Sequence, residues 1–349
     1  MRCQSSTTTS SLDFEKTSSH HIVMSSLLPV SSVIETELSG KLVSVLQQHF
    51  LIPVHVDRIY SLAGYLHPLY LIRLSNETNL LLKCSPSPMT TLPWREHVLL
   101  DTEARFLSLL NKKRMPYIPQ LLHYDPLGEL LGPTFLIRHH IPGSTLQSIE
   151  AQLTTQERNS IDRSLGFLAK RIAQNRSDSF GSLGQVANAK GNRSWREAFL
   201  ALFESILRDA EDVFVNLPYG EIRYYMMQKS PALDEVLVPR LVVVDFGQPS
   251  QVLVDPKSKR LCGITGFGTA VWGDVYMAHI FDSPSPPVMD GFGSCSSTSQ
   301  AERTRQLLYS CFRAVHRIVL QYYGKNRDTT AEVDARRQLM TTLGRMAIL

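Results

Sequence analysis

Lys83 and Glu103 carry opposite charges, and the carboxylate of Glu103 could hold the ammonium group of Lys83 in position to bind a phosphate. Lys83 closes an apolar run that is typical of a strand, and Glu103 lies in the helix-like pattern that follows. In a kinase-like small lobe, a strand lysine held by a helix glutamate directs its ammonium group at the phosphates of ATP. A lysine at a strand end is ordinarily just solvated, and an exposed ion pair contributes little to stability. The pair alone leaves a nucleotide contact and a structural contact open.

The segment 241–274 is the most informative stretch of the chain, and it reads LVVVDFGQPSQVLVDPKSKRLCGITGFGTAVWGD. It resembles the aminoglycoside phosphotransferase family, and most of all the branch common in fungi. The pattern of that family runs Leu-Val-His-x-Asp-Leu-x-x-x-Asn-Val-Leu-Val-Asp-Pro, then Thr-Gly-Ile-Ile-Asp-Phe, then Ala-x-Trp-Gly-Asp-Pro. The segments 135–146, 165–183 and 307–323 are similar to the last small-lobe strand and hinge, an internal helix and the closing helix of the family.

This resemblance covers most of residues 50–345 and implies a fold like that of choline kinase and the protein kinases. Members of the family are ATP-dependent kinases of small molecules. Their catalytic-loop aspartate orients or deprotonates the substrate hydroxyl, while an asparagine and a later aspartate hold magnesium on the phosphates. Asp245 matches the catalytic aspartate, and the histidine two residues earlier in the family is Val243 here.

Both metal-binding positions of the family are altered in this chain. The asparagine falls on Ser250 by strict counting, but the segment 246–251 is one residue longer than usual, so Gln251 is the better match. The second aspartate falls on Gly266, which offers magnesium no side-chain oxygen. Magnesium is normally held by one or two carboxylates together with phosphates. The resemblance implies ATP and magnesium as cofactors, but the loss of these metal ligands argues against both. Without them the rate of phosphoryl transfer is expected to fall by roughly a hundredfold or more.

The candidate phosphate loop, 61–69, is also poor in glycine. It contains only Gly64, which is followed by Tyr65, Leu66, His67 and Pro68. A bulky His-Pro pair limits the close approach of backbone to phosphates. The candidate nucleotide-binding residues are therefore Gly64, Lys83 and Glu103, the candidate catalytic residue is Asp245, and the weak candidate metal ligand is Gln251.

Three aspartates of the same region also have simpler structural interpretations. The side chain of Asp245 could hydrogen-bond its own loop. Asp255 stands in an Asp-Pro sequence that is typical of a turn. Asp274 is expected to cap or brace the start of a helix.

The elements that must position these residues follow from apolar periodicity and turn residues. A β-rich N-terminal part followed by a mostly helical part predicts an α+β, two-lobe, protein-kinase-like fold. We expect a disordered Ser/Thr-rich leader over 1–30, an N-terminal lobe over 31–142 and a helical C-terminal lobe over 143–349. Helices are expected over 31–50, 96–110, 146–175, 195–215 and 303–323 and near the end, and strands over 54–62, 70–74, 80–84, 117–124, 134–139, 241–244, 252–255 and 261–264.

Composition excludes several classes of function. The 349 residues carry 36 Lys and Arg against 32 Asp and Glu, and a net charge of +4 is too small to indicate a nucleic-acid partner. No apolar stretch reaches the ~18 residues of a membrane span. The five cysteines are widely spaced, which favours a reduced, cytoplasmic protein without a zinc ribbon.

Three hypotheses about function stay open. The first is a degenerate, pseudokinase-like binding or accessory protein, and the second is an active ATP-dependent phosphotransferase on a small-molecule hydroxyl. The third is an enzyme of different chemistry that reuses the cleft. Each implies a small-molecule ligand, and a protein partner is compatible with the first. The resemblance to the fungal-type branch, whose genes often lie beside biosynthetic genes, also implies a role in secondary metabolism.

Overall fold

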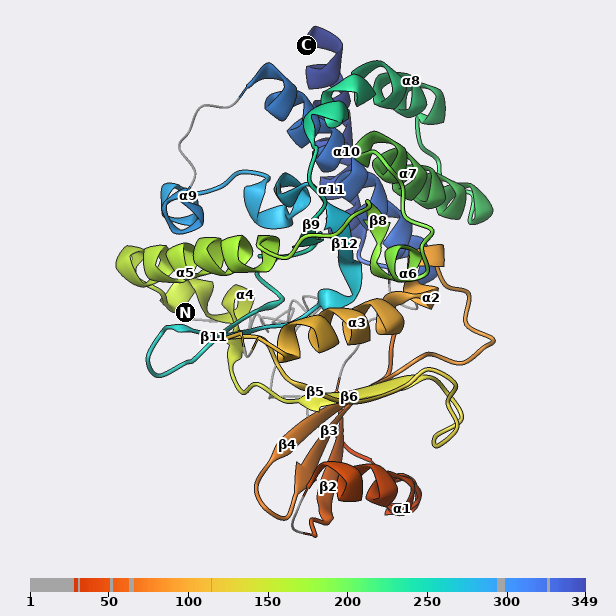
Figure 1. Cartoon of the computed structure of the whole chain (residues 1–349), viewed down its shortest axis with the longest axis vertical. Coiled ribbons are helices and arrows are strands. Elements are labelled where there is room, and N and C mark those ends of the chain that lie inside the picture. Colours follow the sequence, from red (N-terminus) through yellow and green to blue (C-terminus); the bar gives the residue numbers. More distant parts are fainter. Residues whose placement is uncertain are drawn as a thin grey trace, which may run out of the picture.

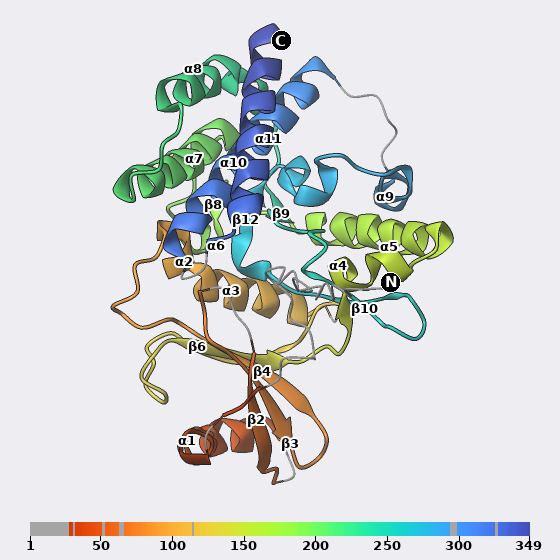
Figure 2. The same ribbon diagram turned by 180° about the vertical axis from the view of Figure 1, so that it is seen from behind.

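The structure, a computed structural model, has two parts that lie one above the other (Figures 1 and 2). An antiparallel sheet forms the N-terminal part, and a larger group of helices forms the C-terminal part. The predicted α+β two-lobe fold is therefore confirmed. The structure describes residues 28–30, 32–50, 53–62, 66–113, 115–293, 299–324 and 327–349.

The N-terminal sheet has six strands within the described residues, in the order β1-β2-β3-β4-β6-β5. The predicted meander of three consecutive strands is present as β2, β3 and β4. The bounds are β1 Leu28–Pro29, β2 Val56–Leu62, β3 Leu69–Leu74, β4 Asn79–Cys84, β5 Leu121–Asp125 and β6 Phe135–His139. Because Leu28 and Pro29 pair with Ser61 and Tyr60, the range predicted as a leader extends too far at its C-terminal end. Its residues 1–27 lie outside the described part of the chain.

The two faces of β4 explain how Lys83 reaches the site. Leu80 and Leu82 pack on the helix α1, Ser32–His49, in a cluster that also contains Leu42. Successive side chains of a strand point to opposite faces, so Leu81 and Lys83 share the face turned away from α1. That face looks toward the helix α3, Leu99–Asn111, which carries Glu103.

The predicted helix 96–110 is in fact two helices, and that prediction was wrong in this respect. The backbone leaves the helical region at Val98, with φ −104° and ψ 3°. This break separates the short helix α2, Trp94–His97, from α3. It turns α2 onto the helical part, where the backbone N–H of Trp94 donates to Asp209 Oδ1 at 3.0 Å.

The predicted helix 146–175 also breaks in two. Thr154 and Glu157 form a capping box, in which each side chain accepts a hydrogen bond from the backbone N–H of the other residue. Such a pair starts a new helix, and α5 runs over Thr155–Ala173 after the single turn of α4, Leu146–Ile149. The other helices are α6 Leu183–Ala187, α7 Trp195–Asp212, α8 Tyr219–Lys229, α9 Pro286–Phe292, α10 Gln300–Tyr323 and α11 Thr329–Ile348, with short 3-10 turns at Glu150–Gln152, Ser230–Glu235, Phe267–Thr269, Val275–Met277 and His279–Phe281.

Two small antiparallel sheets on the side of the helical part that faces the N-terminal part carry the segment that was most informative in the sequence (Figures 1 and 2). One has the order β11-β10-β7 and the other β8-β12-β9. The strand β12 lay outside our predicted elements. The bounds are β7 Ser144–Thr145, β8 Gly181–Ser182, β9 Arg240–Val243, β10 Val252–Val254, β11 Leu261–Ile264 and β12 Ala270–Gly273.

The structural interpretations of Asp255 and Asp274 are confirmed. Asp255 accepts from the backbone N–H of Lys257 at 2.8 Å and from the Ser258 hydroxyl at 3.0 Å, as an Asp-Pro turn requires. Asp274 accepts at the start of a 3-10 turn and also from buried groups of α10, Arg305 Nε at 3.1 Å and the Tyr309 hydroxyl at 2.8 Å. Asp274 therefore braces α10 against β12.

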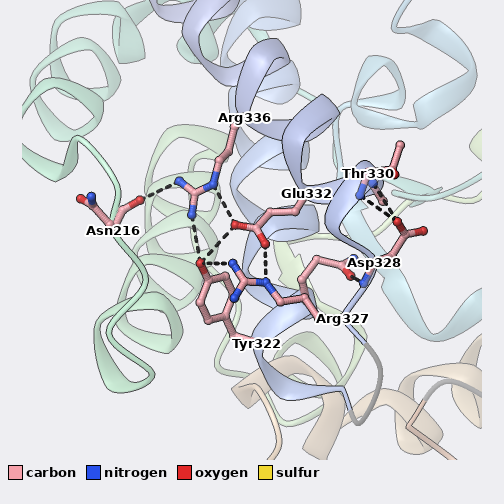
Figure 3. Close-up of polar contacts among 9 residues, drawn as sticks. Asn216, Tyr322, Arg327, Asp328, Thr330, Glu332 and Arg336 are labelled. Carbon is pink, nitrogen blue, oxygen red and sulfur yellow. Dashed lines mark hydrogen bonds and ion pairs between the residues drawn. The ribbon is translucent and has the colours of Figure 1, made fainter.

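A second polar network ties α10 to α11, and we call it the Glu332 clamp (Figure 3). Glu332 accepts from Arg327 Nε at 2.6 Å, Arg336 Nε at 2.8 Å and the Tyr322 hydroxyl at 3.1 Å. Both arginines also donate to the Tyr322 oxygen, and Arg336 Nη1 donates to the carbonyl of Asn216 at 2.8 Å. The hydrogen bonds from Arg327 and Arg336 lower the pKa of Glu332 to about 2, and the carboxylate stays charged.

Candidate functional site

Lys83 and Glu103 form a short ion pair between β4 and α3. Lys83 Nζ lies 2.9 Å from Glu103 Oε2, and the glutamate is only 1% exposed. Arg138 of β6 flanks the same carboxylate, with its Nε 3.5 Å from Glu103 Oε1. Burial raises the pKa of Glu103, but the charges of Lys83 and Arg138 outweigh burial and lower it overall. The pairing expected from the sequence is present, and it fixes the ammonium group of Lys83 near the C-terminal end of the inner strand β4.

The end of the candidate phosphate loop is tied to α2 by a histidine. Gly64 lies outside the described residues, so the structure says nothing of it. His67 is buried, and its Nε2 lies 3.0 Å from Glu96 Oε2 while its Nδ1 lies 3.2 Å from the carbonyl oxygen of Cys84. Both partners are acceptors, so both bonds form together only when both ring nitrogens carry protons. The sequence predicts only a bulky side chain at His67, and the spacing of His67 and Glu96 does not indicate this anchoring role.

Asp245 lies in the turn that follows β9. Its backbone N–H donates to Thr269 Oγ1 at 3.3 Å, and its Oδ1 accepts from Gln248 Nε2 at 3.0 Å. The carboxylate therefore has a partner inside its own loop. This contact agrees with the structural interpretation of Asp245 and leaves the second carboxylate oxygen for another role.

Gln251 and Gly266 lie against each other. A Cβ atom placed on Gly266 would lie 2.4 Å from Gln251 Cδ, 2.5 Å from Oε1 and 2.6 Å from Nε2. The side chain of Gln251 thus fills the space that a side chain at position 266 would need. The backbone N–H of Thr265 donates to the Gln251 carbonyl at 2.9 Å and fixes the two segments side by side. Gly266 has φ +81°, which side-chain-bearing residues rarely adopt.

Among the described residues, five buried side-chain nitrogen or oxygen atoms have no hydrogen-bond partner. Native proteins pair most buried polar groups, and an exception can mark a site for a ligand, ion or water. The five atoms are Arg95 Nη1, Arg138 Nε, His140 Nδ1, Gln251 Oε1 and Arg313 Nε.

No group of three or more His, Cys, Asp or Glu within the described ranges is arranged to hold a metal ion. A cavity of about 160 Å³ lies at the end of α3, lined by Leu110, Asn111, Met115, Ile118 and Gln120, and contains none of the candidate residues. In the part of the chain that the structure describes, no helix is long and apolar enough to cross a membrane.

The sequence matches no family model and no curated protein. Solved structures do match over most of the chain. The streptomycin–ATP–APH(2″)-IIa ternary complex is 16% identical with a TM-score of 0.59, and the alignment covers 92% of this chain and 99% of that one. The GDP complex of aminoglycoside 2′-phosphotransferase-IIIa is 17% identical with a TM-score of 0.57, covering 88% and 99%. A proposed fructosamine-3-kinase from Thermobifida fusca is 16% identical with a TM-score of 0.62, covering 88% and 98%. At these identities the likeness shows a shared fold, the two-lobe fold of small-molecule kinases.

Proposed function

Since the chain has the two-lobe fold of the small-molecule kinases, we propose that it binds a nucleotide or another small molecule between its two parts without a carboxylate-held metal. Its role is that of a degenerate, pseudokinase-like binding or accessory protein. One observation carries the proposal: the Gln251 side chain fills the place of a side chain at Gly266. Neither position supplies a carboxylate.

The chemistry of the two positions does not fit a tightly held magnesium ion. Magnesium takes an octahedral shell of oxygens and is usually held by one or two carboxylates plus substrate phosphates. Gln251 offers one neutral amide oxygen, and Gly266 offers none. The phosphate contact that remains is the ammonium group of Lys83, oriented by Glu103. This charge supports metal-independent binding of a nucleotide phosphate.

An active phosphotransferase is the second candidate, and the intact Lys83–Glu103 pair supports it. Asp245 keeps a carboxylate at the position that matches the catalytic aspartate, and the Gln251 amide oxygen has no hydrogen-bond partner. In this case Asp245 would orient the acceptor hydroxyl. The solved structures with a similar fold include complexes with ATP, GDP and aminoglycosides. A nucleotide and a small-molecule acceptor are therefore the ligands to test first.

Calorimetry of ATP binding, with and without magnesium, separates the two candidates. Wild type is compared with Lys83→Ala and Asp245→Asn, and with Lys41→Ala as a control, because Lys41 forms an exposed pair with Glu37 on α1. We expect weak binding that is insensitive to magnesium, is reduced about tenfold or more by Lys83→Ala and is unchanged by Lys41→Ala.

Magnesium-dependent binding, together with phosphoryl transfer that Asp245→Asn abolishes, would establish the active phosphotransferase instead. Absence of any nucleotide binding would reject the active phosphotransferase, would exclude a nucleotide as the ligand of the first candidate, and would favour an organic ligand instead. A cytoplasmic location, a place in secondary metabolism and the division of the chain at residue 142 remain predictions from the sequence.

A further inference from the structure

Arginines from two distant segments gather around Asp245. Arg95 of α2 and Arg313 of α10 both interact electrostatically with the Asp245 carboxylate. The guanidinium carbon of Arg95 lies 5.5 Å from the centroid of the Phe312 ring. Phe312 directly precedes Arg313 in the chain. The N-terminal part therefore contributes a cation to the surroundings of a carboxylate in the helical part.

A third arginine joins this group through a histidine. Arg317 Nη2 lies 3.3 Å from His279 Nδ1. The backbone N–H of His279 donates to the carbonyl of Val244, directly before Asp245, at 2.8 Å. We call Arg95, Arg313 and Arg317 the arginine cluster.

Some N–H donors of the arginine cluster have no hydrogen-bond acceptor among the described residues. Arg95 Nη1 and Arg313 Nε are buried without a hydrogen-bond partner. In the described part of the chain, neither Arg95 nor Arg317 has a carboxylate at ion-pair distance, whereas Arg313 Nη2 lies 2.6 Å from Asp282 Oδ1. Unmet guanidinium donors in a buried position are costly, because the desolvation of the charge is not offset.

The other ionisable groups nearby do not satisfy these donors. Glu96 is engaged by His67 at 3.0 Å, and Asp209 accepts the backbone N–H of Trp94. Burial lowers the pKa of His279 and of His316 to about 4, so both are neutral at neutral pH and can add no positive charge. The charge available to a ligand is that of the arginines.

We propose that the ligand group bound beside Asp245 is an anion, a phosphate or a carboxylate, held by Arg95 and Arg313. The ligand that carries it is distinct from the nucleotide phosphates at Lys83. The inference rests on the proposed function, because it concerns the second ligand of the same site. A ligand with several ammonium groups is repelled by the same arginines. The guanidinium fork matches the oxygens of phosphate and carboxylate, and charge-assisted hydrogen bonds are the stronger ones.

Calorimetry of the full chain without metal tests this site with three probes: inorganic phosphate, citrate and kanamycin. We expect phosphate or citrate to bind and kanamycin not to bind. Arg95→Gln weakens anion binding about tenfold or more, since one charged hydrogen bond is lost. Arg163→Gln is the matched control, because Arg163 is an exposed arginine of α5 paired with Asp290, and it leaves the affinity unchanged.

A second pair of variants separates this site from the nucleotide site and guards against misfolding. Arg95→Lys keeps the charge but loses the guanidinium fork, so it weakens anion binding less than Arg95→Gln does. Arg317→Gln, which leaves no carboxylate unpaired, also weakens binding less than Arg95→Gln does. Anion binding that depends on Lys83 rather than on Arg95 would overturn the inference, as would tighter binding of kanamycin or no anion binding at all. ATP binding that Lys83→Ala weakens, without Arg95-dependent anion binding, would leave the proposed function standing and reject only this inference.

Discussion

Two charged networks of similar composition lie along the second half of α10, and they differ in how completely their groups are paired. In the Glu332 clamp two arginines and a tyrosine all donate to one shared carboxylate (Figure 3). Around Asp245 two arginines keep buried nitrogen atoms without an acceptor. A fully paired network stabilises the fold, whereas an incompletely paired one is a place where a ligand can supply the missing partner.

Removing the centre of the clamp has the largest expected effect on stability. Glu332→Ala leaves Arg327, Arg336 and Tyr322 without their shared acceptor and lowers the free energy of unfolding by about 2–3 kcal/mol. Urea unfolding measures this loss. The control is Asp334→Ala on the same helix, whose pair with Arg337 is exposed and whose loss costs less than about 0.5 kcal/mol. Equal losses in the two variants would show that the clamp contributes no more than a surface pair.

Placing a carboxylate in the incompletely paired region is the next test. Gly266→Asp alone is expected to destabilise the protein by about 2 kcal/mol, because φ is positive there and the new side chain meets Gln251. The double variant Gly266→Asp with Gln251→Asn makes room and recovers the part of that loss that comes from the contact with Gln251. In calorimetry with ATP the double variant gains magnesium dependence. If the single variant is as stable as wild type, Gln251 does not occupy the space as described.

Acidification should weaken the clamp selectively. The pKa of Glu332 in the folded protein, about 2, is below its value of about 4.3 in an unfolded chain. The contribution of this carboxylate is therefore complete above about pH 4.3 and is lost as the pH falls toward 2. Urea unfolding from pH 6 downward is expected to show the difference in stability between wild type and Glu332→Gln shrinking below about pH 4. A difference that stays constant over this range would contradict the assignment.

The smallest expected effect on stability belongs to the arginine cluster. Arg95→Gln removes a buried cation that has an unmet donor, so the free energy of unfolding changes by less than about 1 kcal/mol in either direction. Thermal or urea unfolding checks this, and the same variant loses affinity for anions. A loss as large as that of Glu332→Ala would show that Arg95 is a structural residue like those of the clamp.

The sequence predicted the fold and the ion pair more fully than the rest of the site. The apolar run in 80–84 placed Lys83 on a strand, and helical periodicity placed Glu103 on a helix. The capping box of Thr154 and Glu157 was visible in the sequence but was passed over, so two helices were merged. The resemblance matched Gln251 and Gly266 to two separate positions of the family pattern, and their direct contact was found only in the structure.

The role of Arg95 could not be predicted from the sequence. Arg95, Asp245 and Phe312 are far apart in the chain, and each belongs to an element whose local pattern is ordinary. The break at Val98 turns α2 toward α10, and no residue type at this position predicts a helix break. The anchoring of His67 by Glu96 depends on the same turn and was missed for the same reason.

The chain crosses between its two parts at more than one place. It passes first through α2, which is held on the helical part by the bond from Trp94 to Asp209, and again through 140–143. A body attached to another at two separated points can rotate only about the line that joins them. Any opening that admits a ligand must therefore turn about an axis through α2 and residues 140–143, with His67 and Glu96 close to that axis and the far edge of the sheet moving most.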